Sequence, residues 1–482
     1  MIEKNTINDF IRSFNERVIG DKTVGEIINY KGHPIWWFVG IGFTYDTLPN
    51  LFDNRNTILT KIKNRKKPAS KRKTKKLLRK LRWNERLKNL YLKFTGWRFV
   101  ISEESVIFIS PTTFLKNKNE DYILDKFNDI QNALSANGIK TDIISTDPLS
   151  KKFSFKIEDY PNVTNTFKKT KKIKKAAKEL AINYKKVKKQ LQLSAQDKII
   201  FNMMEAAFDF YFSKEIIGII LTHYEYYRQI MSKYKTKLFV IEEASDIRTR
   251  ALIAAGKDSN TPVLHIYHGL GNETDKLAYS PNLVKSIPGR YACGPLSEMG
   301  FKKEQIYLTG PTFMDEINKV QSQDGDYILF LTQTMVEDGF VSEKNYINKM
   351  TEAITSMKDN KIVIKMHPRE IGRKRYIKIL KKLKVKDYKV IGNEGNLYDL
   401  ISKCKMVVAY GSTAIIEAIA IGKPVILLDI FSYYKGNPLF DNLKTIEITQ
   451  QKEFVEKNLH VLDGAAKERN VRLIKRLIDW KY

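Results

Sequence analysis

Cysteine is nearly absent from this sequence, which has two cysteines in 482 residues. Cys293 and Cys404 lie far apart and beside no other metal-ligand pattern, which argues against a disulfide scaffold and favours a reducing, cytoplasmic compartment. The N-terminus lacks the basic start and apolar run of a signal peptide, and no uncharged segment reaches the ~20 residues that a spanning helix needs. These absences predict a protein that is soluble or peripheral to a membrane.

Acidic residues are also scarce, with 54 Asp and Glu against 84 Lys and Arg and a net charge of +30. The basic excess is concentrated in two blocks, residues 60–93 and 168–189. Solvated helix faces account for such blocks. Attraction to an anionic membrane surface also accounts for them, because lysines near an acidic leaflet gain about 1 kcal/mol each. Neither block has the interleaved aromatic residues of a base-stacking platform, so nucleic acid is the less favoured partner.

The length and the apolar content indicate a folded chain of more than one domain. Hydrophobic residues make up 43% of the sequence, and 482 residues exceed one ordinary core. Alternating strand and helix patterns predict an α/β protein with parallel sheets. The expected organisation is an N-terminal domain at 1–310 with basic helical insertions at about 56–98 and 165–195, a linker at 311–326 and a C-terminal domain at 327–482.

In the N-terminal domain, apolar runs and helical periodicity predict alternating strands and helices. The predicted strands are 105–111, 141–145, 238–242, 262–267, 291–294 and 305–310, and the predicted helices are 122–137, 199–231 and 247–255. The aromatic stretch 30–45 is too short to cross a bilayer. We expect it to pack on this domain, with an interfacial role for Trp36 and Trp37 as the alternative.

In the C-terminal domain, strict alternation predicts a doubly wound parallel sheet. The predicted elements are the strands 327–332, 361–365, 388–391, 406–409 and 424–429 and the helices 343–357, 372–383, 397–402 and 413–421. A final basic helix, at about 465–480, is expected to pack back across the domain junction.

Three short motifs follow strands of this predicted sheet. They are Val336–Gly339, Met366–Glu370 and Gly411–Thr413. In open parallel sheets, ligands bind outside the carboxyl ends of the strands. We therefore expect the three motifs to meet at one site although they are far apart in the sequence.

The Gly411–Thr413 motif has the features of an anion site. Ser412 occupies an N-cap position and Thr413 opens a helix, where unpaired N–H groups and the helix dipole attract negative charge. An ordinary helix cap has the same sequence pattern.

The other two motifs offer acid and base groups. His367, held by Pro368, can donate a hydrogen bond or a proton to a departing phosphate, and Arg369 has a planar guanidinium suited to an anion. Glu337 and Asp338 place two carboxylates on a loop, where the like charge of one can raise the pKa of the other and make it a base. A surface acidic turn is the alternative reading of the pair.

The N-terminal domain has its own candidate residues at strand ends. His268 follows a strand and precedes Gly269 and Gly271, which allow the backbone to turn sharply and expose the side chain. Glu243 follows the preceding strand, whereas His265 lies inside a strand and is predicted to be a core residue.

Together, these motifs resemble those of bacterial sialyltransferases and polysialyltransferases, which carry acidic-acidic-Gly, His-Pro and Ser/Thr motifs on a GT-B fold. The resemblance rests on Phe330–Gly339, Lys365–Glu370, Gly411–Ala418 and Gly422–Ile426. Residues 242–271 more loosely resemble the N-terminal domain of surface-polysaccharide glycosyltransferases. The resemblance implies two Rossmann-like domains that face each other across a cleft.

The resemblance also implies a role for each candidate residue. Asp338 would be the general base, with Glu337 as its partner or substitute, and His367 would stabilise the leaving nucleotide phosphate. The acceptor side would include His268 and Glu243. No Asp-x-Asp motif occurs in 327–482, so neither a metal nor a cofactor is expected. The residues expected to bind the donor phosphate and nucleotide are Gly411, Ser412, Thr413, Pro368, Arg369, Thr332 and Gln333.

The function implied by the resemblance is an inverting transfer of sialic acid or a related nonulosonic acid. The donor would be CMP-activated and the acceptor a cell-surface glycan or glycolipid. The protein itself would be cytoplasmic and peripheral at the inner face of the cell membrane. A CDP-glycerol or CDP-ribitol type phosphotransferase is an alternative, in which His268 is essential and Asp338 dispensable. A UDP-sugar glycosyltransferase and a non-catalytic protein that binds membranes or nucleic acid are further alternatives.

Overall fold

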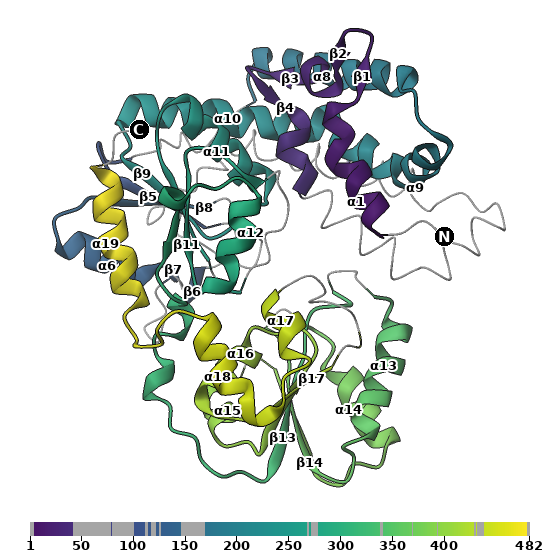
Figure 1. Ribbon diagram of the computed structural model, residues 1–482, viewed down its shortest axis with the longest axis vertical. Coiled ribbons are helices and arrows are strands. Elements are labelled where there is room, and N and C mark those ends of the chain that lie inside the picture. The colour runs from purple at the N-terminus through teal and green to yellow at the C-terminus, as the bar shows by residue number, and fades with distance from the viewer. Residues whose placement is uncertain are drawn as a thin grey trace.

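The computed structural model shows the chain as two lobes (Figure 1). Each lobe is built around a parallel β-sheet that carries helices. This arrangement confirms the predicted α/β class of GT-B type, with two Rossmann-like lobes. The structure describes residues 4–41, 79, 101–110, 114–116, 122–124, 127–145, 169–267, 269–270, 278–337, 341–368, 370–392, 394–428, 430 and 438–479.

The first lobe contains a six-stranded parallel sheet with the strand order β12-β11-β10-β9-β5-β8. All residues of the adjacent inner strands β9, β10 and β11 are buried, because helices cover both faces of the sheet. The helices α10 and α11 pack on one face, and α6 and α19 pack on the other. The bounds are β5 (Val106–Ser110), β8 (Thr141–Ser145), β9 (Leu238–Ile241), β10 (Val263–Ile266), β11 (Leu283–Ile287), β12 (Ile306–Leu308), α6 (Asn128–Ala136), α10 (Lys214–Tyr234), α11 (Ile247–Asp258) and α19 (Ala466–Ile478).

One strand of this sheet was not predicted, and one predicted strand is wrong. Residues 291–294 lie in a 3₁₀ helix, Arg290–Ala292, and in α12 (Cys293–Glu298). The strand beside β10 is instead β11, whose apolar run is interrupted by Lys285 and Ser286. Both polar side chains find partners inside the protein: Lys285 contacts His265 Nδ1 at 3.0 Å, and Ser286 donates to Asn470 Oδ1 at 2.6 Å.

Two predicted helices of the first lobe are shorter than expected. The helix predicted at 122–137 begins only at Asn128, because residues 122–124 form β7 (Tyr122–Leu124), which pairs with β6 (Phe114–Lys116). The long helix predicted at 199–231 is two helices, α9 (Ala195–Tyr211) and α10. Ser213 separates them, and its Oγ accepts a hydrogen bond from the Ile216 N–H at 3.4 Å to cap α10.

A helical layer joins the N-terminal residues to the first lobe. It contains α1 (Lys4–Ser13), β1 (Val18–Ile19), β2 (Lys22–Thr23), α2 (Val24–Ile27), α8 (Lys171–Gln190) and α9. Trp36 is 1% exposed, stacks on Phe208 with 5.5 Å between ring centroids, and donates its Nε1–H to the Ile11 carbonyl at 3.1 Å. The interfacial alternative for Trp36 is therefore wrong, because the indole belongs to an aromatic core. Within the described ranges, no helix has the length and apolar character needed to cross a bilayer.

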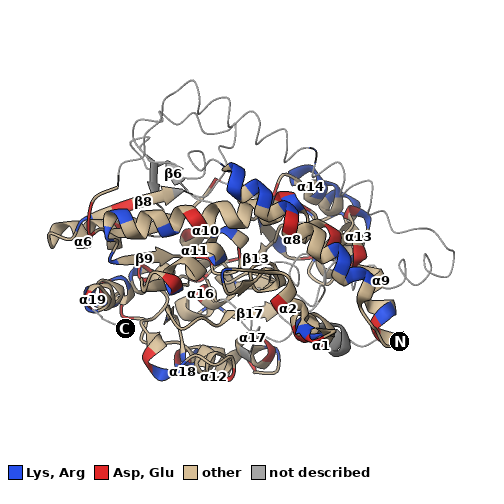
Figure 2. Cartoon of the chain, turned by 90° about the horizontal axis from the view of Figure 1, so that it is seen from above, with Lys and Arg blue, Asp and Glu red and all other residues tan. Residues whose placement is uncertain are grey.

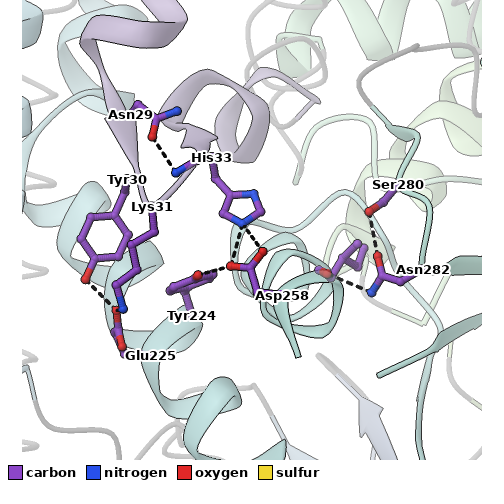
Figure 3. A network of polar contacts seen from close by, with 11 residues as sticks. Asn29, Tyr30, Lys31, His33, Tyr224, Glu225, Asp258, Ser280 and Asn282 are labelled. Carbon is purple, nitrogen blue, oxygen red and sulfur yellow. Dashed lines mark hydrogen bonds and ion pairs between the residues drawn. The ribbon is translucent and has the colours of Figure 1, made fainter. Parts of the chain in front are cut away.

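A polar network fixes the N-terminal hairpin to this lobe (Figure 3). The hairpin consists of β3 (Asn29–Tyr30) and β4 (His33–Pro34). His33 Nε2 lies 3.0 Å from both oxygens of Asp258 at the end of α11, and the Tyr224 hydroxyl of α10 donates to the same carboxylate. A second carboxylate, Glu225, accepts from the Tyr30 hydroxyl at 2.7 Å and pairs with Lys31 at 2.6 Å. The hairpin is thus hydrogen-bonded to two helices of the first lobe.

The second lobe has a five-stranded parallel sheet with the order β15-β14-β13-β16-β17. The nine elements predicted at 327–429 alternate as expected, and each bound lies within two residues of the prediction, whereas α17 and α18 were not predicted. One face packs on α13 and α14, and the other packs on α15, α16 and α18. The bounds are β13 (Tyr327–Leu331), α13 (Glu343–Thr355), β14 (Lys361–Lys365), α14 (Arg373–Lys382), β15 (Tyr388–Ile391), α15 (Leu397–Ser402), β16 (Met406–Ala409), α16 (Ala414–Ile421), β17 (Val425–Leu427), α17 (Pro438–Leu443) and α18 (Gln451–Asn458).

The basic helix α19 returns to the first lobe, as predicted, and lies beside α6 (Figure 1). Its buried Leu473, Ile474 and Leu477 join the apolar cluster under the first sheet. Asp315 holds its start, because its carboxylate accepts from the N–H groups of Ala466 and Lys467 at 3.0 and 2.8 Å. Residues 466–478 therefore pack on the first lobe although they lie in the range predicted for the second domain.

Candidate functional site

The three strands that precede the motifs of the second lobe end at one edge of its sheet. The strands β14, β13 and β16 are adjacent, and their last residues are in register, with Leu331 opposite both Lys365 and Ala409. The residues after these strands therefore lie side by side at the carboxyl edge of the sheet. The shared edge brings Thr332, Gln333, His367 and Ser412 into one region.

A loop of the first lobe reaches the same region. Gly269 follows β10, and a Cβ atom built on it would lie 3.4 Å from Thr413 Cγ2. The carboxyl end of a first-lobe strand thus contacts the β16–α16 loop of the second lobe. His268 precedes Gly269 but lies outside the described residues.

The β16–α16 loop presents Ser412 and Thr413 at the start of a helix. The Ser412 Oγ accepts a hydrogen bond from the Ala414 N–H at 3.2 Å, and its carbonyl accepts from the Ile415 N–H at 3.2 Å. The helix begins at Ala414, one residue later than predicted, and Thr413 makes no side-chain capping bond. Gly411 is buried, whereas Ser412 and Thr413 are half-buried. Because the Ser412 oxygen accepts, its hydroxyl hydrogen remains to donate to an anion.

His367 is half-buried just after β14, and Pro368 beside it is exposed. The His367 backbone N–H donates to Glu370 Oε2 at 2.9 Å, which folds the motif into a tight loop. Thr332, at the end of β13, is buried and donates its hydroxyl to the same oxygen of Glu370. One carboxylate therefore holds the ends of β13 and β14 together. Arg369 lies outside the described residues.

A buried chain of tyrosines continues from Glu370 to the end of β16. The Tyr376 hydroxyl donates to Glu370 Oε1 at 2.5 Å and contacts the Tyr346 hydroxyl at 2.5 Å. Tyr346 contacts the Tyr410 hydroxyl, whose oxygen accepts the Gln333 N–H at 3.1 Å. We call Glu370, Tyr376, Tyr346 and Tyr410 the Glu–Tyr relay. It links the three loops that carry the motifs.

The relay is placed in an apolar environment that fixes its protonation. Burial raises the pKa of Tyr346, Tyr376 and Tyr410, so their hydroxyls keep their protons as hydrogen-bond donors. Burial also raises the pKa of Glu370, although hydrogen bonds from Thr332, Tyr376 and the His367 N–H act in the opposite direction. The sequence motif included Glu370 but did not predict a role for it. The three tyrosines were not predicted as site residues, because in the sequence they resemble core residues.

Glu337 is not a free carboxylate in this structure. Its Oε1 pairs with Arg375 Nη2 at 3.2 Å, and the two side chains are 14% and 6% exposed. Arg375 belongs to α14 and also lies 5.2 Å from the centre of the Tyr346 ring. The pair fastens the turn before Asp338 to α14 and to the relay. Asp338 and Gly339 themselves lie outside the described residues.

The candidates of the first lobe differ in their surroundings. Glu243 is half-buried and accepts hydrogen bonds from the Ser245 N–H, at 2.7 Å, and from its hydroxyl, so it shapes the loop after β9. His265 is buried, with Nε2 3.2 Å from the Glu242 carbonyl oxygen and Nδ1 against Lys285. His265 is therefore a satisfied core residue, as predicted.

No group of three or more His, Cys, Asp or Glu side chains in the described part of the chain could hold a metal ion. Cys404 is buried and Cys293 is half-buried, and both are free thiols. A groove of about 750 Å³ lies elsewhere, near the amino ends of β9 and β10, and is lined by Glu225, Arg228, Gln229, Met231, Ser232, Lys233 and Ser259. It is not part of the site at the carboxyl ends of the strands.

The helix that starts at the site carries a buried acid, Glu417. It is 8% exposed, and its Oε1 lies 3.0 Å from the Tyr398 hydroxyl, which is also 3.0 Å from the Phe313 carbonyl oxygen. A hydroxyl has one hydrogen, so both contacts are satisfied when a protonated Glu417 donates to Tyr398. Burial raises the pKa of Glu417 to about 7, although the hydrogen bond with Tyr398 acts in the opposite direction.

We expect Glu417→Gln to change the pH dependence of stability. The native carboxyl holds its proton up to a pH of about 7, whereas the ordinary pKa of a glutamate side chain is 4.5. The stability that the protonated Glu417 contributes to the folded state is therefore fully present below pH 4.5 and is lost as the pH rises through about 7. Relative to wild type, the glutamine variant should gain up to about 3 kcal/mol of stability between pH 5 and pH 8. Thermal unfolding at both pH values measures this, with the exposed Glu453→Gln as control, and a pH-independent difference contradicts it.

A model of one protein family matches most of the chain. The match is to the LIC12162 family transferase and covers residues 45–452. The chain belongs to the LIC12162 transferase family. Among curated proteins, no sequence matches this LIC12162 transferase.

Solved structures that resemble this LIC12162 family member have low sequence identity to it. The UDP-GlcNAc 2-epimerase from Neisseria meningitidis bound to UDP-GlcNAc is 14% identical, covers 77% of this chain and 100% of its own, and has a TM-score of 0.43. The UDP-GlcNAc 2-epimerase from Methanocaldococcus jannaschii is 16% identical, covers 77% of this chain and 99% of its own, and has a TM-score of 0.41. MurG from Acinetobacter baumannii is 10% identical, covers 77% of this chain and 99% of its own, and has a TM-score of 0.42.

Proposed function

We propose that this transferase is an inverting glycosyltransferase that uses a nucleotide-activated sugar and an acceptor glycan or glycolipid. The observation that carries the proposal is the meeting of three strand ends of the second lobe, tied by the Glu–Tyr relay, with the Gly269 loop of the first lobe. Ligands of parallel α/β sheets bind at such carboxyl edges. A site formed between two lobes can bind a donor on one lobe and an acceptor on the other.

The donor phosphate is assigned to the start of α16. Ser412 and Thr413 stand at the positive end of this helix, where N–H groups and hydroxyl hydrogens donate to an anion. His367 from the neighbouring loop is the proposed acid or hydrogen-bond donor to the leaving phosphate. The remaining donor contacts are assigned to Gly411, Pro368, Arg369, Thr332 and Gln333.

Asp338 is the proposed general base toward the acceptor hydroxyl. Its neighbour Glu337 is paired with Arg375, so we assign Glu337 to holding the loop rather than to replacing the base. His268 and Glu243, at strand ends of the first lobe, are assigned to the acceptor side. Neither a metal nor a cofactor is required by these roles.

The proposed donor is a CMP-activated nonulosonic acid, on the basis of the motif resemblance to sialyltransferases. CDP-glycerol or CDP-ribitol and UDP-sugars are the alternative donors. Membership of a transferase family favours an enzyme over a non-catalytic binding protein. In the CDP case, His268→Ala abolishes transfer and Asp338→Asn spares it, whereas the proposed mechanism requires Asp338.

A thermal-shift panel with CMP, CDP and UDP tests the donor. A nucleotide that binds only the folded state stabilises it by about 2.7 kcal/mol at 100 times its dissociation constant. We expect the largest rise in melting temperature with CMP, and we expect the Ser412→Ala, Thr413→Ala double variant to lose most of it.

A matched control removes two hydroxyls elsewhere in the same lobe. Thr355 and Ser356 are exposed at the end of α13, so Thr355→Ala, Ser356→Ala should keep the full nucleotide shift. A larger shift with UDP or CDP would show that the donor contains that nucleotide instead of CMP. No shift with any of the three nucleotides overturns the nucleotide-sugar proposal.

A further inference from the structure

The outward face of α8 is composed of lysines. The helix has a single acidic residue, Glu179, and no arginine. Its exposed cations, which we call the α8 lysine face, are Lys171, Lys172, Lys174, Lys175, Lys178, Lys185, Lys186 and Lys189.

Packing fixes the direction of this face. The buried residues of α8 recur every three or four positions and pack against α10; they are Ile173, Ala177, Leu180, Tyr184 and Val187. Thr170 caps the helix by accepting the Ile173 N–H at 3.2 Å, and the Tyr184 hydroxyl donates to Asp209 at 3.2 Å. A helix held in this way cannot rotate its lysines inward, so the whole charge faces solvent.

The face contains one exposed acidic residue, Glu179, against eight lysines. Lys188, on the side of the helix, pairs with Glu205 at 2.9 Å and Asp209 at 2.6 Å. None of the eight lysines of the face has an ion-pair partner among the residues that the structure describes. Like charges one turn apart on a helix destabilise it. An external polyanion would remove this repulsion.

A second basic helix lies toward the same side of the molecule. In Figure 2, α8 of the first lobe and α14 of the second both carry Lys and Arg on the upper side of the view. The exposed lysines of α14 are Lys374, Lys378, Lys381 and Lys382. A broad anionic surface on this side would therefore meet lysines of both lobes.

We propose that the α8 lysine face binds the anionic surface of a phospholipid bilayer. Lysine is a compact, flexible charge that suits a diffuse array of headgroups, whereas bidentate phosphate recognition uses arginine. A single-stranded nucleic acid needs exposed aromatic residues for stacking, and Tyr184, the one aromatic residue of α8, is buried. Ile182, 42% exposed on the same helix, adds an apolar contact.

This binding is independent of the donor and of the transfer reaction. It concerns the described part of the basic block 168–189, since of the block 60–93 only Arg79 is described. A protein held in this way would work at the membrane surface, where a glycolipid acceptor lies.

Co-sedimentation with lipid vesicles tests the proposal. The vesicles contain either phosphatidylcholine alone or equal parts of phosphatidylcholine and phosphatidylglycerol. We expect the full chain to sediment with the anionic vesicles and not with the neutral ones, and to be released as salt is raised. The variant Lys174→Gln, Lys178→Gln, Lys185→Gln, Lys189→Gln should bind the anionic vesicles about 1,000-fold more weakly.

The control removes the same number of charges on the opposite side. Lys302, Lys303, Lys452 and Lys457 are exposed, and the elements nearest to them, α12 and α18, lie on the lower side of Figure 2. Changing these four to glutamine also lowers the net charge of +30 by four, to +26, yet should leave vesicle binding within about twofold of wild type.

Four results would overturn the proposal: no binding to anionic vesicles, equal binding to both kinds of vesicle, equal losses in the two quadruple variants, or tighter binding of a short DNA duplex through the same lysines. Both variants should show the nucleotide-induced thermal shift of the wild type. Failure of membrane binding is therefore distinguished from failure of the proposed transferase activity.

Discussion

Glu370→Ala is expected to destabilise the second lobe by about 4 kcal/mol. The carboxylate accepts hydrogen bonds from the Tyr376 hydroxyl at 2.5 Å, the His367 N–H at 2.9 Å and the Thr332 hydroxyl. Its removal takes the charged acceptor from all three donors, leaving the Thr332 hydroxyl a contact of 3.5 Å with the Lys365 carbonyl and the Tyr376 hydroxyl only its contact with Tyr346. A buried donor that loses its acceptor costs about 1 to 3 kcal/mol. Thermal unfolding followed by circular dichroism measures the loss.

Glu394→Ala is the matched control for this substitution. Glu394 pairs with Arg373 at 2.9 Å, but the two side chains are 55% and 54% exposed, so solvent screens their attraction. We expect almost no change in its melting temperature. Equal losses in the two variants would show that the relay does not stabilise the lobe.

The Glu370→Ala variant should also lose nucleotide binding when it is still folded at low temperature. Glu370 holds the loops that contain Thr332 and His367, so these loops separate when the carboxylate is absent. Tyr376→Phe, which removes one hydrogen bond of the relay, should show an intermediate loss of both stability and binding.

His367→Ala is expected to lower the turnover of the transferase by about 100- to 1,000-fold with little change in melting temperature. The imidazole lies after β14, beside the loops of Thr332 and Ser412, where the leaving phosphate is proposed to bind. A group that stabilises charge on the leaving phosphate acts mainly in the transition state, so substrate binding should change much less than turnover.

Release of free nucleotide from the donor identified by the thermal-shift panel measures this effect. His460→Ala serves as the control, because His460 is a half-buried histidine outside the three motifs, and its N–H donates to the Pro288 carbonyl of the first lobe at 3.1 Å. Its turnover should equal that of the wild type. Unchanged turnover in the His367→Ala variant would remove this histidine from the mechanism.

The sequence was sufficient for the architecture of the second lobe. Its strands are buried runs such as Ile362–Ile364, and its helices alternate apolar and polar faces, so local pattern and tertiary burial agree. In the first lobe this agreement fails at β11. Lys285 and Ser286 are buried there because His265 and Asn470, 20 and 184 residues away, satisfy them. A local pattern contains no information about such distant partners.

The site was predicted in outline but not in its supporting contacts. The ends of three adjacent strands could be located from sequence, because parallel strands place their carboxyl ends together. The relay could not be located from sequence, because Tyr346 and Tyr376 lie on helices and resemble ordinary core residues. Only the structure places Glu370 beside them. The ion pair of Glu337 with Arg375 was missed for the same reason. The roles of Asp338, Arg369 and His268 stay predictions, because these residues lie outside the described ranges.

The position of α19 constrains how this protein can be synthesised and divided. The first sheet is complete at Leu308, but the helix that covers one of its faces starts only at Ala466. A ribosome therefore needs on the order of ten seconds to translate the 157 residues between these points (309 to 465), and during this time α6 packs on that apolar face without α19. Cutting the chain once, in the connector at 311–326, would give an N-terminal fragment that aggregates. Adding residues 466–478 as a separate peptide should restore its solubility.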